Sequence, residues 1–109
     1  MSKTTKSYST WENQINEVSN IKKVIYNTKK YLGSNTKLYP SERQFKKYKI
    51  FNPDTNKFIH FGDIRYKDFT KHQDKTRQNN YLKRATNIKG DWKNNKYSPN
   101  SLSINILWK

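Results

Sequence analysis

Cysteine is absent from the 109 residues of the chain, which excludes disulfide bonds and thiolate metal sites and fits a reducing compartment. Long apolar runs are also missing, and none approaches the roughly 18 residues that a membrane-spanning helix needs. The lysines near the N-terminus precede no hydrophobic segment, so the pattern of a secretory signal is not met. We therefore expect a soluble protein with no membrane partner.

Acidic residues are scarce. The chain has 8 Asp and Glu against 23 Lys and Arg, which gives a formal net charge of +15. Such an excess makes the folded chain repel itself, and a polyanionic partner relieves that repulsion. Compositional bias is the alternative explanation, because Lys outnumbers Arg 19 to 4 and Asn occurs 14 times, as an AT-rich genome would encode.

Hydrophobic residues make up only 31% of the chain, although aromatic residues reach 15%. A fully disordered chain normally has fewer aromatic residues, so these values favour a small core built from large rings. The length allows one small domain with an appendage, and not two full cores.

Two segments are predicted to precede that domain. Residues 1–10 are polar and basic and predict a flexible tail. Apolar residues at helical spacing predict a helix over residues 11–32, and Gly33 suits the position after a helix end. The apolar stripe of this helix contains Trp11, Ile15, Val18 and Ile25. Because the stripe is narrow, it indicates a face that packs on a core or on a partner.

Residues 33–42, with the sequence GSNTKLYPSE, contain Gly, Pro and Ser and predict a linker. A small basic α+β domain is expected over residues 43–109, and a fragment of residues 41–109 is expected to fold alone. Two β-prone runs, KKYKIF and KFIHF, flank the turn residues 52–56 and predict a hairpin. Their alternation puts Tyr48 on a packed face and lysines on the other face.

One or two helices are predicted to pack on the hairpin, which gives an α+β fold. The first covers about residues 71–86, with a capping pattern at residues 70–73 and Asp68 or Asp74 at its positive end. Residues 99–108 alternate like a strand, whereas Ser98 followed by proline is typical of a helix start, and we favour the helix. Trp108 is expected to close the core against the hairpin and Tyr81.

Basic and aromatic residues alternate along the predicted domain. Lysines act as point charges on phosphates, and tyrosines can stack on exposed bases. The scarcity of arginine argues against base-specific recognition, which favours bidentate guanidinium contacts. The candidate nucleic-acid-binding residues are Lys46, Lys47, Lys49, Arg65, Lys67, Lys71, Lys75, Arg77, Lys83 and Arg84, with Tyr48, Tyr66 and Tyr81 interleaved.

Short motifs follow in a fixed order from about Tyr48 to Trp108. They are HFG at 60–62, YKDFTKH at 66–72, YLKR at 81–84, DW at 91–92, SP at 98–99 and ILW at 106–108. The segment resembles an uncharacterised family of small basic proteins of giant nucleocytoplasmic DNA viruses. The resemblance implies a viral protein in the virion or in the host cytoplasm or nucleus, and it implies no chemistry. Ala85 departs from the pattern, which often has a histidine at this position.

An enzyme would need catalytic groups that converge. The available groups are His60, Asp63, Asp68, His72 and Asp74, but the acids are scattered and no histidine pair at i,i+4 exists. No glycine-rich phosphate loop or nucleophile motif occurs. We therefore predict a non-enzymatic protein with no catalytic residue, cofactor or metal.

The predicted function is sequence-tolerant binding of DNA or RNA phosphates by a viral protein packaged in the virion. The alternative is a minor structural or capsid-associated protein that bridges acidic virion proteins. In that case an apolar helix face would bind the partner. The partner-binding residues would be Trp11, Ile15, Val18, Ile25 and Trp108.

Overall fold

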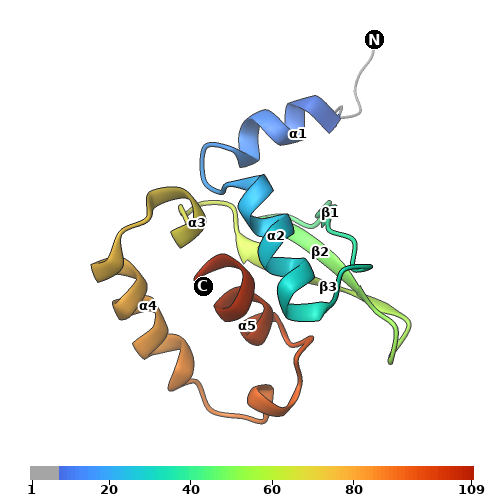
Figure 1. Ribbon diagram of the computed structural model, residues 1–109, viewed down its shortest axis with the longest axis vertical. Helices are drawn as coiled ribbons and strands as arrows, with labels where there is room; N and C mark the ends of the chain where they lie inside the picture. Colours follow the sequence, from blue (N-terminus) through green and yellow to red (C-terminus); the bar gives the residue numbers. More distant parts are fainter. Residues whose placement is uncertain (1–7) are drawn as a thin grey trace.

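The computed structural model describes residues 8–109 and has an α+β fold, as the sequence predicts (Figure 1). A three-stranded antiparallel sheet with the order β1-β2-β3 is packed with helices. The elements are α1 Tyr8–Ile15, α2 Ile21–Leu32, β1 Tyr39–Pro40, β2 Lys46–Asn52, β3 Lys57–Asp63, α3 Phe69–His72, α4 Lys75–Thr86, η1 Trp92–Asn94, α5 Pro99–Leu102 and η2 Ser103–Leu107. Among residues 8–109, no helix is long and apolar enough to cross a bilayer.

The predicted hairpin is confirmed and consists of β2 and β3. Tyr48 pairs with Phe61 and Ile50 pairs with Ile59, so the alternating apolar residues of both strands point to one face. In the turn, Asn56 has a φ of 59°, a left-handed conformation that asparagine tolerates. The register therefore buries the side of the hairpin that the sequence pattern predicts.

The predicted linker over residues 33–42 contains a strand. Tyr39 and Pro40 form β1, and they pair with Lys49 and Tyr48 of β2. A proline is tolerated there because β1 is an edge strand, where a missing amide hydrogen breaks no pairing on the outer side. The segment is therefore partly an element of the sheet.

The single helix predicted over residues 11–32 is wrong, because the chain forms α1 and α2 with a break between them. Asn20 caps α2, since its side chain accepts a hydrogen bond from the amide of Lys23. The break changes which residues face inward, so that Val24 is buried and Ile25 is 38% exposed. Of the predicted tail, residues 1–7 lie outside the described residues, and residues 8–10 belong to α1.

The helix predicted over residues 71–86 is also divided, into α3 and α4. Gln73 takes a left-handed conformation after α3, and Asp74 caps α4 by accepting from the amides of Thr76 and Arg77. The predicted cap at Thr70 is wrong, because Asp68 caps α3 and Thr70 lies inside it. Both aspartates therefore lie at helix N-termini, where their charge is favourable.

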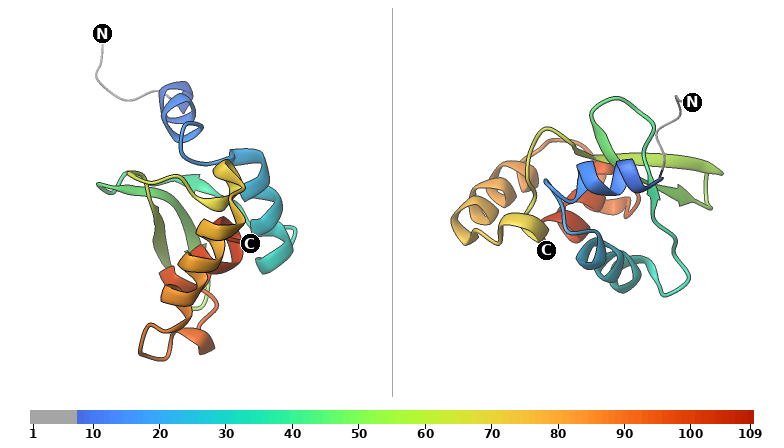
Figure 2. Two further views of the ribbon diagram at one scale, coloured as in Figure 1. Left: turned by 90° about the vertical axis from the view of Figure 1, so that its left-hand side faces the viewer. Right: turned by 90° about the horizontal axis from the view of Figure 1, so that it is seen from above.

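The C-terminal segment is helical, as predicted. Ser98 caps α5 with Pro99 in its first turn, and the chain continues through η2 with π-helical geometry. In both views of Figure 2 this segment lies in the middle of the molecule, with the sheet, α2 and α4 around it. The side-chain amide of Asn27 in α2 donates to the carbonyl of Ile106 over 2.9 Å, which ties the two helices together.

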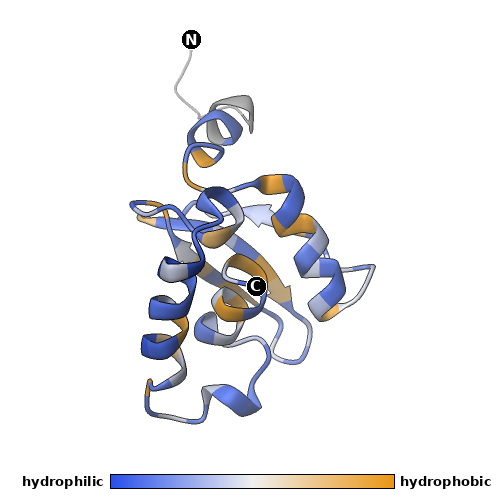
Figure 3. Cartoon of the chain, turned by 60° about the vertical axis from the view of Figure 1, so that its left-hand side comes forward, coloured by the Kyte–Doolittle hydropathy of each residue, from blue (hydrophilic) through white to orange (hydrophobic). Residues whose placement is uncertain are grey.

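One hydrophobic core joins the N-terminal helices, the sheet and the C-terminal segment. Figure 3 shows hydrophobic residues on the C-terminal helix and the strands, whereas α4 is mostly hydrophilic. The buried cluster contains Ile15, Val24, Tyr48, Ile50, Phe61, Tyr97, Leu102, Ile106 and Leu107. Ile15 of α1 and Val24 of α2 therefore belong to the same core as the hairpin.

Candidate nucleic-acid interface

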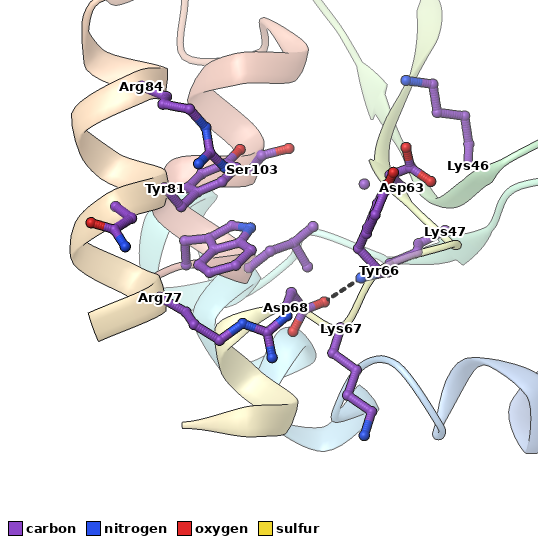
Figure 4. A pocket seen from close by; sticks show the side chains of 14 residues that line it. Lys46, Lys47, Asp63, Tyr66, Lys67, Asp68, Arg77, Tyr81, Arg84 and Ser103 are labelled. Atoms are coloured by element: carbon purple, nitrogen blue, oxygen red, sulfur yellow. Dashed lines mark hydrogen bonds and ion pairs between the residues drawn. The ribbon is translucent and has the colours of Figure 1, made fainter. Parts of the chain in front are cut away.

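A cleft of about 510 Å³ opens between the end of the hairpin and helix α4 (Figure 4). The hairpin and the loop after it line one side, α4 lines the other, and the C-terminal segment completes the lining. The lining residues are Lys46, Lys47, Gly62, Asp63, Tyr66, Lys67, Asp68, Arg77, Asn80, Tyr81, Arg84, Ser103, Leu107 and Trp108. Six of the predicted nucleic-acid-binding residues from the hairpin, its loop and α4 therefore meet here, together with Tyr81.

Gly62 lets the hairpin approach the C-terminal segment. Its φ is +83°, which favours glycine, and a Cβ atom at this position would lie 2.9 Å from Cδ1 of Leu107. It would also lie 3.1 Å from Cβ and 3.2 Å from Cδ of Lys47. No other residue fits this position without a shift of Leu107, so the glycine determines how closely the hairpin approaches the C-terminal segment.

Both carboxylates of the cleft are already paired. Asp63 accepts two hydrogen bonds from the guanidinium of Arg65, at 2.9 and 2.7 Å, and these hold the pKa of Asp63 below its usual value. Asp68 accepts from Nζ of Lys47 over 2.9 Å in the protein interior. Arg65 and Lys47 therefore neutralise the two negative charges of the cleft.

Four basic side chains of the cleft remain: Lys46, Lys67, Arg77 and Arg84. None of them forms an ion pair with a carboxylate within residues 8–109. In Figure 4 Arg77 and Arg84 extend from α4, and Lys46 and Lys67 from the opposite side. The cleft therefore has an excess of positive charge on both walls, which attracts and concentrates anions.

Aromatic rings also line both sides. Tyr66 belongs to the loop after β3 and is 61% exposed. Opposite it, Tyr81 stacks on Trp108 with ring centroids 4.1 Å apart and planes at 8°, so the predicted contact between these two residues is confirmed. Burial raises the pKa of Tyr81, and a hydrogen bond with Ser103 opposes this shift. Gln78 of α4 donates to the carbonyl of Trp108 over 2.9 Å and fixes the end of the chain against α4.

Two predicted contacts to nucleic acid are wrong. Tyr48 is fully buried and donates a hydrogen bond to Ser19 over 2.7 Å, so its ring cannot stack on a base. Lys47 is also buried, and the removal of its ammonium group from water lowers its pKa in spite of Asp68. The burial of Tyr48 agrees with the strand alternation, whereas the burial of Lys47 departs from it, because the alternation predicts exposed lysines on the other face.

The other predicted basic residues lie outside the cleft. Lys49 pairs with Glu42 over 2.9 Å and lies over the ring of Phe58 at 4.5 Å. Arg65 is held by Asp63 and by the ring of Phe45, 4.4 Å away. Lys71, Lys75 and Lys83 are exposed on α3 and α4. None of these five residues lines the cleft.

The predicted partner-binding stripe does not form one free surface. Ile15 is fully buried in the core, Val18 is half-buried against it, and Ile25 is exposed on α2. The side chain of Trp11 lies outside the described residues. Trp108 is half-buried and stacks within the molecule. The interruption after α1 explains this result, because the two helices present their apolar residues in different directions.

The two histidines lie apart and each has a local partner. His60 Nδ1 lies 2.7 Å from the hydroxyl of Ser41, and His72 Nδ1 accepts from the amide of Asp74 over 2.9 Å. Burial lowers the pKa of both rings, with additional repulsion from Arg43 at His60 and from Arg77 at His72. Within residues 8–109, no three His, Asp or Glu side chains are grouped as metal ligands would be.

Comparison with known proteins adds one match. Residues 36–85 match the model of a family of unknown function (DUF5754). This segment contains the hairpin, the loop with Tyr66 and most of α4, and therefore both main walls of the cleft. It does not contain the C-terminal segment with Trp108. No curated protein and no solved structure matches the chain.

Some side chains of the cleft are not predicted from the sequence. Asn80 and Ser103 line the cleft but have no charge or ring that would distinguish them in the sequence. Trp108 was assigned to the core or to a partner, whereas it also lines the cleft. The spacing of Asn80 could have indicated its place beside the arginines. It lies three residues after Arg77 and four before Arg84, and residues at these spacings share a helix face.

Proposed function

We propose that the protein is a non-enzymatic, sequence-tolerant nucleic-acid-binding protein and that the cleft beside α4 is its binding site. The observation that carries the proposal is the set of four basic side chains, from two walls, that have no carboxylate partner within the described residues. Phosphates spaced along a strand can contact both walls at once. The resemblance to proteins of giant DNA viruses supports a viral origin and a place in the virion as part of the same proposal.

Sequence tolerance follows from the kind of contact. Lysine and arginine bind phosphates, and phosphate contacts carry no sequence information. Only four arginines occur in the chain, so few bidentate contacts to guanine are available. The overall charge of +15 adds a long-range attraction that is independent of sequence.

The test is the salt dependence of affinity. If the cleft neutralises about four phosphates, log affinity for a duplex falls against log salt with a slope of about −3.6. The double variant Arg77→Gln/Arg84→Gln removes two cleft charges and should reduce the slope to about −1.8. Lys22→Gln/Lys23→Gln removes the same charge from the exposed part of α2 and is the matched control.

Fluorescence anisotropy with two duplexes of unrelated sequence measures these slopes. We expect equal affinities for the two duplexes, a reduced slope for the cleft variant and little change for the control. A flat salt response contradicts nucleic-acid binding. Equal losses in the two variants contradict the cleft as the site, and a 100-fold preference for one duplex contradicts sequence tolerance.

A structural role in the virion is the second candidate, and one surface favours it. Tyr39, Phe51 and Phe58 are 37%, 40% and 41% exposed on the sheet, and the ring of Phe58 contacts the other two edge to face. We call these three residues the sheet patch. Exposed apolar patches of this kind often bind proteins. Copurification with the capsid, and not with the genome-containing core, would favour this role over nucleic-acid binding.

A further inference from the structure

The cleft has features that phosphate binding alone does not require. Aromatic rings stand on its opposite sides, and two uncharged hydrogen-bonding groups, Asn80 and Ser103, lie between the charges. We propose that the cleft takes one unpaired base of a single-stranded nucleic acid, with Tyr66 on one side and the Tyr81–Trp108 pair on the other. This inference rests on the proposed function and specifies its substrate class.

The size of the cleft fits this ligand. A volume of about 510 Å³ lies within the range of roughly 300–1,000 Å³ in which proteins bind small organic molecules. A base with its sugar fits inside this space, whereas a double helix cannot enter it and can use only the basic side chains at its edges. Figure 4 shows Tyr66 across the cleft from Tyr81 and Arg84, so a base inserted between them has an aromatic ring on either side.

The chemistry of the walls matches the parts of a nucleotide. Tyrosine and tryptophan rings stack on any base, because every base has a π-face. The side-chain amide of Asn80 and the hydroxyl of Ser103 can donate to and accept from a base edge. Arg77 and Arg84 lie three and four residues from Asn80 along α4 and can hold the phosphates on either side of the base.

A duplex cannot use these features. In a double helix the base faces are stacked on one another, and only the edges are accessible in the grooves. The exposed ring of Tyr66 would then lie against the backbone without stacking. The same protein should therefore bind a duplex through charge alone and bind a single strand through charge and stacking together.

An acidic peptide is the other polyanion that four cations attract. It offers carboxylates but no flat ring, so the aromatic walls would add nothing to its binding. A poly-glutamate peptide therefore serves as a probe that shares the charge of a nucleic acid and lacks its bases.

The experiment compares a thymidine oligonucleotide, a duplex of the same length and poly-glutamate by anisotropy at several salt concentrations. We expect the single strand to bind most tightly. Tyr66→Ala should weaken it about fivefold or more without changing the salt slope, because stacking involves no charge. Tyr66→Phe keeps the ring and should bind as the native protein does.

Tyr26→Ala is the matched control, since Tyr26 is 62% exposed on α2 and does not line the cleft.

A second measurement uses the fluorescence of Trp108. In the variant Trp11→Phe/Trp92→Phe, Trp108 is the remaining tryptophan, and the single strand should quench its fluorescence more than the duplex does.

If the single strand and the duplex bind with equal, salt-dependent affinity and Tyr66→Ala leaves that affinity unchanged, the base pocket is overturned. The proposed function then still stands. Tighter binding of poly-glutamate than of either nucleic acid overturns both. Loss of single-strand affinity in Tyr26→Ala as large as in Tyr66→Ala overturns the assignment of the base to the cleft.

Discussion

Lys47 and Asp68 form an ion pair in the protein interior, with side chains exposed by only 2% and 1%. The second oxygen of Asp68 accepts from the amide and the hydroxyl of Thr70, and the Asp68 amide donates to the carbonyl of Val18 over 3.0 Å. Through these bonds Asp68 joins β2, the segment after α1 and the start of α3. Of these three parts, β2 also lines the cleft through Lys46 and Lys47.

We expect Asp68→Asn to lower the free energy of unfolding by about 3 kcal/mol or more, because it leaves the Lys47 ammonium buried without a counter-charge. Adding Lys47→Met should restore most of this stability, since the unpaired charge is then gone. Asp63→Asn is the control, because its pair with Arg65 is exposed and contributes about 1 kcal/mol or less. Urea denaturation followed by circular dichroism measures all three values. A loss of under 1 kcal/mol for Asp68→Asn would contradict this account.

At the scale of elements, local pattern predicted the hairpin, its turn and the C-terminal helix. These predictions are confirmed because each depends on residues that are close in the sequence. The strands follow from the alternation over β2 and β3, and the helix start follows from Ser98 and Pro99. The breaks in the two longer helices were missed. Apolar spacing continues across Asn20, and no proline or glycine marks Gln73, so the capping by Asn20 and Asp74 decides where each helix begins.

The candidate site was predicted in part for the same reason. Charge in the sequence identified Lys46, Lys67, Arg77 and Arg84, which line the cleft. It could not distinguish them from Lys47, because the adjacent lysines at 46 and 47 have the same chemistry and only tertiary packing buries the second. The cleft itself depends on how α4 lies against the hairpin, which no local pattern contains.

The N-terminal helices belong to the same cooperative unit as the sheet. Ile15 and Val24 are fully buried with Tyr48, and Asn27 is bonded to Ile106. We therefore expect a fragment of residues 41–109 to lose cooperative unfolding, in contrast to the independent folding that the composition of residues 33–42 suggests. A thermal melt of this fragment beside one of residues 8–109 tests the point. A sharp transition in the shorter fragment would show that the domain begins after the linker.

At the scale of the molecule, few of the positive charges of residues 8–109 are neutralised. These residues contain 21 of the 23 Lys and Arg of the chain and three ion pairs between side chains. A concave surface focuses such a field more strongly than a flat one. The cleft beside α4 is concave and has cations on both walls. An anion in the cleft is therefore attracted both by the electrostatic field of the whole molecule and by the basic side chains next to it.

The most direct test of the cleft as the binding site is a titration of the ¹⁵N-labelled protein with a short thymidine oligonucleotide, followed by nuclear magnetic resonance. We predict that the largest shifts occur at the backbone amides of Gly62, Lys67 and Arg84, while those of Lys22 and Lys23 on α2 remain unchanged. Shifts confined to the sheet patch or to α2, with the cleft amides unmoved at saturation, would contradict the account.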